Sequence, residues 1–95
     1  MIRVIIERQL KPGCYEEYAT VIRRAKKEAA RKQGFMGGEL YFDQADTNRI
    51  YIIAAWDTIQ HWEQWDKSAE RKSLTQELAE LMSGPEKVTV LTSRR

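Results

Sequence analysis

A strand-like segment from Ile50 to Trp56 constrains the fold more than any other feature of the sequence, because it is apolar on both sides. Successive side chains of a strand point to opposite faces of its sheet. One face would carry Ile50, Ile52, Ala54 and Trp56, and the other would carry Tyr51, Ile53 and Ala55. We therefore expect this strand to belong to a sheet that is covered on both faces.

The rest of the chain alternates between strand and helix patterns. Apolar side chains recur at every second residue in the first segment and three or four residues apart in the second. Turn formers, among them Pro12-Gly13 and Gly84-Pro85, separate the segments. The predicted elements are strands over residues 2–7, 35–43, 49–56 and 88–91, and helices over residues 14–32, 58–65 and 68–82.

This order of elements is that of the ferredoxin-like split βαβ fold, in the α+β class. The topology gives an antiparallel sheet with its helices on one face. Ninety-five residues are enough for one domain, which we assign to residues 1–95. Since the helices cover only one face, we expect a second copy of the chain to pack against the other face and form a homodimer.

The composition excludes a membrane-spanning chain. The longest apolar run, from Ile50 to Trp56, is seven residues, whereas a membrane helix requires roughly 20. The N-terminal segment places Arg3 and Glu7 within its apolar stretch and lacks a small-residue cleavage site, so it predicts a strand rather than a signal peptide. We expect a cytoplasmic protein with no membrane partner.

The residues available for metal or nucleic-acid binding are few. One cysteine, Cys14, and one histidine, His61, cannot form the usual zinc ligand sets, so we expect no metal. The net charge of +2 is too small to argue for nucleic acid, and the basic side of the first helix is typical of a solvated face. The strand over residues 49–56 also lacks the glycine and aromatic pattern of RNA-recognition sheets, so we expect no nucleic-acid partner.

Short motifs follow one another in a recognisable order. They are Gly34-Phe35-Met36-Gly37-Gly38-Glu39-Leu40, the strand end Ala55-Trp56-Asp57-Thr58, then Trp62 and Trp65, and finally Gly84-Pro85. In this order the sequence resembles, over nearly its whole length, the antibiotic biosynthesis monooxygenase family of the dimeric α/β-barrel superfamily. The resemblance implies a dimer whose two sheets form a barrel, with a pocket in each subunit between sheet and helices.

One branch of that family degrades haem, and its residues are only partly present here. Its porphyrin-packing tryptophan matches Trp65. The histidine that ligates iron falls at Thr75, and an asparagine of the first strand falls at Ile6. Because the axial ligand is missing, we do not expect haem degradation.

A second branch oxidises polycyclic phenols to quinones without metal or flavin. Its strand-end tryptophan matches Trp56, while its pocket tyrosine is replaced by Trp62 and its pocket histidine falls at Tyr41. An asparagine and an arginine of that branch fall at Ile52 and Gln76. Such an oxygenase needs a pocket that excludes water and a group that takes up the proton of the phenol, so that the substrate becomes an electron-rich anion. This sequence indicates the apolar pocket more clearly than the proton acceptor.

Aromatic residues are the candidate ligand contacts. At helical spacing after Thr58, Trp62 and Trp65 lie on one side, where they either form walls for a flat ligand or pack in the core. His61 lies at the edge of that side, and histidine is the residue type whose unperturbed pKa lies near neutrality. The candidate catalytic residues are therefore His61 and Trp62, unless His61 is merely solvated. The candidate substrate-binding residues are Tyr18, Tyr41, Tyr51, Trp56, Trp62 and Trp65.

Two functions follow from these residues and the resemblance. The first is a cofactor-free monooxygenase acting on an aromatic, phenolic or quinone-type molecule that lies between Trp56, Trp62, Trp65, Tyr41 and Tyr51. The second is a non-catalytic member of the same fold that binds an apolar small molecule or acts as an interaction module. The loss of the asparagine and the arginine favours the second.

Overall fold

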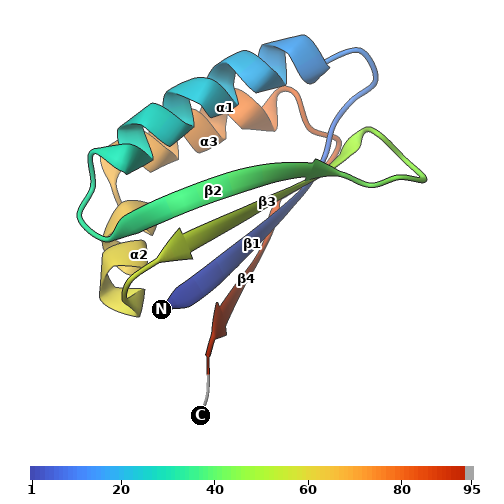
Figure 1. The fold of residues 1–95 in the computed structure, drawn as a ribbon. Helices are drawn as coiled ribbons and strands as arrows, with labels where there is room; N and C mark the ends of the chain where they lie inside the picture. The colour runs from blue at the N-terminus through green and yellow to red at the C-terminus, as the bar shows by residue number, and fades with distance from the viewer. Residues whose placement is uncertain (94–95) are drawn as a thin grey trace.

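The computed structural model describes residues 1–93, which form a four-stranded antiparallel sheet and three helices (Figure 1). The strands are β1 (Ile2–Gln9), β2 (Phe35–Phe42), β3 (Arg49–Trp56) and β4 (Lys87–Thr92). The helices are α1 (Tyr15–Ala30), α2 (Ile59–Asp66) and α3 (Ala69–Ala79). The strand order β2-β3-β1-β4 and the antiparallel pairing confirm the predicted α+β, ferredoxin-like fold.

The two central strands fix the register of the sheet. Strand β1 pairs with β3 along its whole length, so that Ile2 lies opposite Trp56 and Gln9 lies opposite Arg49. The predicted strand over residues 2–7 is therefore too short, because Arg8 and Gln9 continue the pairing. In β2 the register shifts between Phe35 and Gly38, which is a β-bulge.

Side-chain caps set the starts of α2 and α3. The Thr58 hydroxyl accepts a hydrogen bond from the backbone N–H of His61 at 3.2 Å, and the Ser68 hydroxyl accepts one from Arg71. The predicted helix over residues 68–82 ends early, at Ala79. The chain turns there and brings Met82 beside Leu10, with which it forms an isolated β-bridge.

The helices cover one face of the sheet. Helices α1 and α3 lie across that face, and α2 lies at the end of the sheet where β2 begins and β3 ends (Figure 1). On the covered face, Ile50, Ala54 and Trp56 are buried in the core. On the opposite face, which we call the bare face, Tyr51 and Ile53 of the same strand are only half-buried.

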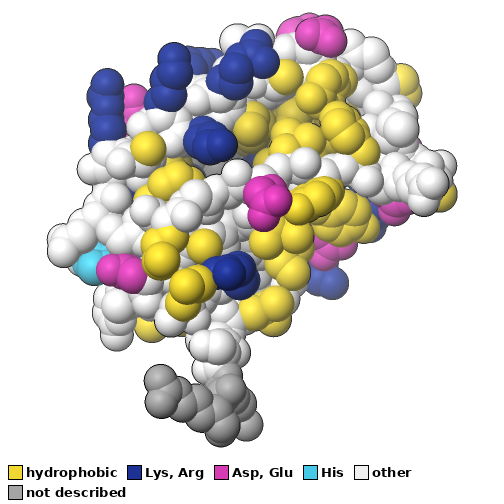
Figure 2. All heavy atoms as spheres, in the orientation of Figure 1, with side chains coloured by type: hydrophobic (Ala, Val, Ile, Leu, Met, Phe, Trp, Pro, Cys, Tyr) yellow, Lys and Arg dark blue, Asp and Glu magenta, His cyan; other side chains and the backbone are white. Residues whose placement is uncertain are grey.

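The basic side of α1 is only partly free. Figure 2 shows Lys and Arg side chains gathered along α1, at the top of the view. Arg24 pairs with Glu77 at 2.7 Å and Lys32 pairs with Glu70 at 2.8 Å, and both acidic residues belong to α3. The first pair joins α1 to α3, and the second joins the turn after α1 to α3, so part of the charge that the sequence predicted to be solvated is paired.

Candidate functional site

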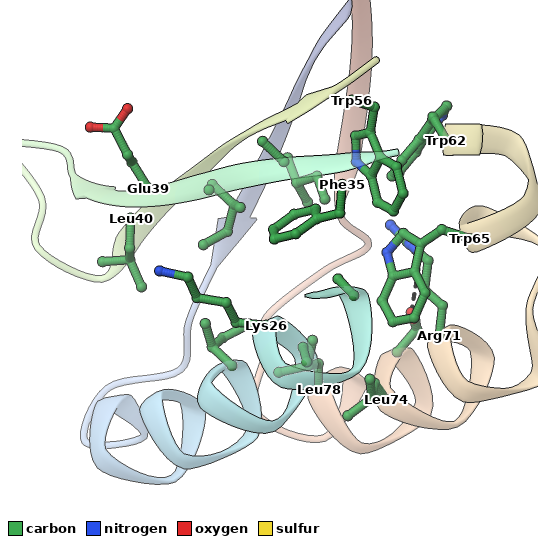
Figure 3. A pocket seen from close by; sticks show the side chains of 18 of the residues that line it. Lys26, Phe35, Glu39, Leu40, Trp56, Trp62, Trp65, Arg71, Leu74 and Leu78 are labelled. Carbon is green, nitrogen blue, oxygen red and sulfur yellow. Dashed lines mark hydrogen bonds between the residues drawn. The ribbon is translucent and has the colours of Figure 1, made fainter. Parts of the chain in front are cut away.

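A cavity of about 170 Å³ lies between the covered face of the sheet and the three helices (Figure 3). Its wall is mostly apolar and draws on every layer of the fold. Apolar lining residues include Ile6, Leu40, Ile52, Ala54, Leu74 and Leu78. An apolar cavity of about 150 Å³ is large enough to bind benzene, so this one is large enough for a single-ring ligand.

Aromatic side chains form one end of the cavity. All three tryptophans of the chain, Trp56, Trp62 and Trp65, line it, and each is at least nine-tenths buried. The rings of Trp56 and Trp65 are stacked with centroids 6.5 Å apart, and Phe35 meets the Trp56 ring edge-on at 5.3 Å. The tryptophan wall that helical spacing predicted is therefore present, with flat surfaces suited to a flat apolar ligand.

The start of α2 holds this wall in place. The backbone N–H of Asp57 donates to the Gly34 carbonyl at 2.9 Å, which ties the end of β3 to the turn before β2. Gly34 has a φ of +91°, and a Cβ there would overlap the Asp57 carboxylate and lie 2.6 Å from His61 Nδ1. Only glycine fits this position without displacing the residues that open α2.

The structure does not bring His61 to the cavity. Its side chain is 19% exposed on the outer side of α2, and Nδ1 lies 2.6 Å from Asp57 Oδ1. The hydrogen bond from His61 lowers the pKa of the Asp57 carboxyl. Of the two candidate catalytic residues, Trp62 lines the cavity and His61 does not.

The three candidate tyrosines also lie outside the cavity lining. Tyr41 and Tyr51 are paired across β2 and β3 on the bare face, because they alternate with the residues that face the helices. The Tyr41 hydroxyl donates to Glu39 at 2.6 Å. The expectation of one pocket bounded by the tryptophans together with Tyr41 and Tyr51 is therefore wrong for these two residues.

Tyr18 lies on α1 and is fully buried. Its hydroxyl accepts a hydrogen bond from Arg8 Nη1 at 3.0 Å, and burial raises the pKa of that hydroxyl. Tyr18 belongs to the core cluster rather than to the cavity lining. Tyr18 therefore contacts Arg8, which lines the cavity, but does not line the cavity itself. It could influence a bound ligand only by positioning Arg8.

A buried charged cluster, which sequence analysis missed, forms another part of the cavity wall. Arg8 and Arg71 both line the cavity and are only 6% and 8% exposed. Glu86 joins them: its Oε1 accepts from Arg8 Nη2 at 2.9 Å and its Oε2 accepts from Arg71 Nη2 at 3.0 Å. Burial raises the pKa of Glu86, but the two arginines outweigh that effect and lower it overall.

The sequence holds a signal for each arginine. Arg8 continues the alternation of Ile2, Val4 and Ile6, the buried positions of β1. Arg71 lies three residues before Leu74, on the inner face of α3. Charged side chains are rarely buried. An arginine at a position where the pattern predicts burial is therefore a stronger indication of a functional site than an arginine elsewhere in the chain.

Three positions that the family resemblance singled out lie in the cavity wall. Ile6 and Ile52 are apolar there, and the Thr75 hydroxyl accepts a hydrogen bond from Arg71 Nη1 at 3.1 Å. Tyr41 and Gln76, which the resemblance also singled out, do not line the cavity. Within residues 1–93, no three His, Cys, Asp or Glu side chains are grouped as metal ligands.

Comparisons with known proteins establish the family and the fold of the chain. The family model for antibiotic biosynthesis monooxygenases matches residues 1–77. The chain belongs to the antibiotic biosynthesis monooxygenase family. No protein with a curated description matches it significantly in sequence.

Solved structures show the same fold at low sequence identity. A conserved protein from Methanosarcina mazei Go1 is 17% identical, with a TM-score of 0.90 over 98% of this chain and 92% of that one. Rv0793 from Mycobacterium tuberculosis is 15% identical, with a TM-score of 0.86 over 99% and 95%. A variant of SnoaB from Streptomyces nogalater, described as a cofactor-independent oxygenase, is 18% identical, with a TM-score of 0.87 over 99% and 93%.

One further property concerns membranes. Among residues 1–93, no helix combines the length and apolar character needed to cross a bilayer.

Proposed function

We propose that this member of the antibiotic biosynthesis monooxygenase family oxidises an aromatic, phenolic or quinone-type small molecule in the cavity, without a bound metal or flavin. The observation that carries the proposal is the apolar cavity walled by all three tryptophans. A flat substrate would stack against Trp56 and Trp65, and the apolar wall would exclude water from it.

The chemistry requires little from the protein beyond binding and charge. An ionised phenol is electron-rich enough to pass an electron to dioxygen, which then adds to the ring carbon. One oxygen atom remains as the new carbonyl, and the other leaves as water with the two hydrogens that the phenol loses. A dry site that favours the substrate anion would accelerate this sequence.

A homodimer is the proposed assembly, with the whole chain, residues 1–95, acting as one domain. The bare face supports it, because Tyr51, Ile53 and Ala55 are half-buried there while Tyr41 and Leu91 are 46% and 47% exposed. A second copy of this face would bury these side chains and produce a barrel. The cytoplasm is the proposed location.

Oxygen uptake tests the catalytic proposal. Phenol, hydroxynaphthoquinones and anthrone, which have one, two and three rings and can each form a phenolate or enolate, would be compared with matched samples of Trp62→Ala and Trp65→Ala. We expect uptake above both variants for at least one substrate, with smaller rings favoured by the size of the cavity. Uptake equal to that of the variants across the panel would overturn it.

A specific observation favours the second function, a non-catalytic binder. The cavity is apolar at Ile6 and Ile52, and His61 lies outside it. In this case an aromatic molecule would bind without oxygen uptake. A ligand that quenches the tryptophan fluorescence but leaves dissolved oxygen unchanged would select this function.

A further inference from the structure

We infer that Arg8 and Arg71 form an anion-binding subsite in the cavity wall, and that the natural ligand is an aromatic molecule carrying an ionised oxygen. The inference rests on the proposed small-molecule role of the cavity and specifies its ligand. The shared chemistry is a carboxylate or a phenolate attached to an aromatic ring.

Arg8 and Arg71 both belong to the cavity wall. They come from different elements, β1 and α3, and both line the cavity while being more than nine-tenths buried. The Arg71 guanidinium carbon lies 5.4 Å from the centroid of the Trp62 ring. The charged and aromatic parts of the wall are therefore adjacent at Arg71 and Trp62, which are both labelled in Figure 3. A ring stacked on the tryptophans would therefore direct a substituent toward the arginines.

Each guanidinium retains hydrogen-bond donors for a ligand. Arg8 donates to Glu86 through Nε and Nη2 and to Tyr18 through Nη1. Arg71 donates to Thr75 through Nη1 and to Glu86 through Nη2. Because each Nη atom carries two hydrogens, these bonds leave one N–H unused on every Nη of both residues.

The charges in this wall do not balance. Two buried arginines face one partly buried carboxylate, that of Glu86, whose side chain is 15% exposed, and this leaves an excess of one positive charge. Asp66 lies 3.5 Å from Arg71 Nε but is 44% exposed, so solvent weakens its contribution.

The other charged residues of the cavity lining add no further negative charge to this wall. Lys26 of α1 adds a positive charge but is exposed, so solvent weakens its contribution as it weakens that of Asp66. The Glu39 side chain points away from the helices (Figure 3). An anion entering the cavity would neutralise the excess charge of the two arginines.

Glu86 has a definite role in this arrangement. It holds the two guanidiniums together through separate carboxylate oxygens, so that they can bind one anionic group between them. It also competes with the ligand for the same donors. Removing its charge should therefore tighten anion binding, whereas a purely structural ion-pair network predicts no such gain.

The decisive experiment compares the affinities of the cavity for a charged and an uncharged ligand of the same shape. The indole N–H signals of Trp56, Trp62 and Trp65 would be followed by NMR while benzoate or benzamide is added, since these have nearly the same shape and differ in charge. We expect benzoate to bind at least about tenfold more tightly, the effect of one charge-assisted hydrogen bond. With 4-nitrophenol, which distinguishes a phenolate from a carboxylate ligand, we expect the bound molecule to ionise at lower pH than the free one.

Variants distinguish binding at the two arginines from a general effect of the net charge of the protein. Arg71→Gln and Arg8→Gln should each weaken benzoate about tenfold and leave benzamide unchanged. Glu86→Gln should tighten benzoate binding. The control is Arg24→Gln, which makes the same change of charge in an exposed pair and should have little effect.

Several results would overturn the inference. They are equal affinity for benzoate and benzamide, no perturbation of the tryptophan signals by either, or loss of benzoate affinity in Glu86→Gln. The comparison of the two ligands uses the unmodified protein, so it holds even where an arginine variant fails to fold. Because no step depends on turnover, absence of oxygen uptake would reject the proposed enzyme while leaving the anion preference measurable.

Discussion

The two faces of the sheet are built from similar apolar side chains but differ in how completely they are covered. Along β3, Ile50 and Trp56 are 0% and 1% exposed on the covered face. Tyr51 and Ile53, which alternate with them, are only half-buried on the bare face. The difference arises from topology, because the helices of this fold lie on one side. It divides the proposed roles: the covered face holds the ligand cavity, and the bare face is the surface offered to a second copy.

The largest expected effect is on the covered face. Trp56→Ala removes a ring that contacts Phe35, Trp62 and Trp65, and it should lower the free energy of unfolding by about 3–5 kcal/mol. Urea titration followed by circular dichroism measures it. The control is Ile59→Ala on the outer part of α2, whose side chain is 38% exposed and which should cost much less. Similar losses for both variants would contradict the assignment of Trp56 to the centre of the core.

On the bare face, the corresponding change should affect assembly more than folding. Ile53→Glu places a carboxylate in each copy at the proposed interface, where an uncompensated buried charge costs several kcal/mol. We expect the wild type to sediment at micromolar concentration at twice the 11.1 kDa of one chain, and the variant to sediment as a folded single chain. Gln60→Glu adds the same charge on α2 and should leave the dimer intact. A wild type that sediments at 11.1 kDa would disprove the proposed barrel.

The junction between β3 and α2 should respond less strongly. Gly34→Ala forces a side chain into a backbone with φ of +91° and against Asp57 and His61. Gly13→Ala is the matched control, because Gly13 has φ of +80° but open space around it, so it should show only the backbone strain of about 1–2 kcal/mol. We expect Gly34→Ala to lower the melting temperature more than Gly13→Ala. Equal shifts would show that contact with Asp57 and His61 contributes little.

The smallest expected effect is a dependence on pH. The pKa of Glu86 is lowered in the folded protein, so its contribution to stability is present above its unfolded value of about 4.3 and is lost as pH falls through the folded value. The difference in stability between wild type and Glu86→Gln should therefore shrink as pH is lowered below about 4. Urea titrations at a series of pH values measure it. A difference that stays constant into acid would mean that Glu86 is not ionised in the cluster.

Much of the fold could be predicted because local patterns determine it. The alternation in β1 and the apolar residues of β3 each have a local physical cause and appear as expected. The ends of elements were less predictable. Gln9 continues β1, and α3 stops at Ala79, because pairing with distant segments decides both.

The candidate site was predicted less well than the fold. Helical spacing placed Trp62 and Trp65 correctly, but Tyr41 and Tyr51 were grouped with them although strand alternation puts these tyrosines on the other face. Arg8 was in phase with buried residues and could have been found. Glu86 could not, because it precedes β4 and its contact with both arginines depends on tertiary packing far along the chain.

The division of roles between the two faces can be tested in one NMR measurement. Nuclear Overhauser effects would be recorded between phenol, as a single-ring probe, and the methyl groups of the protein. We predict contacts with Ile6, Ile52 and Leu74, which line the cavity, and none with Ile53 or Leu91 on the bare face. Contacts confined to Ile53 and Leu91 would place the ligand on the bare face and contradict the account.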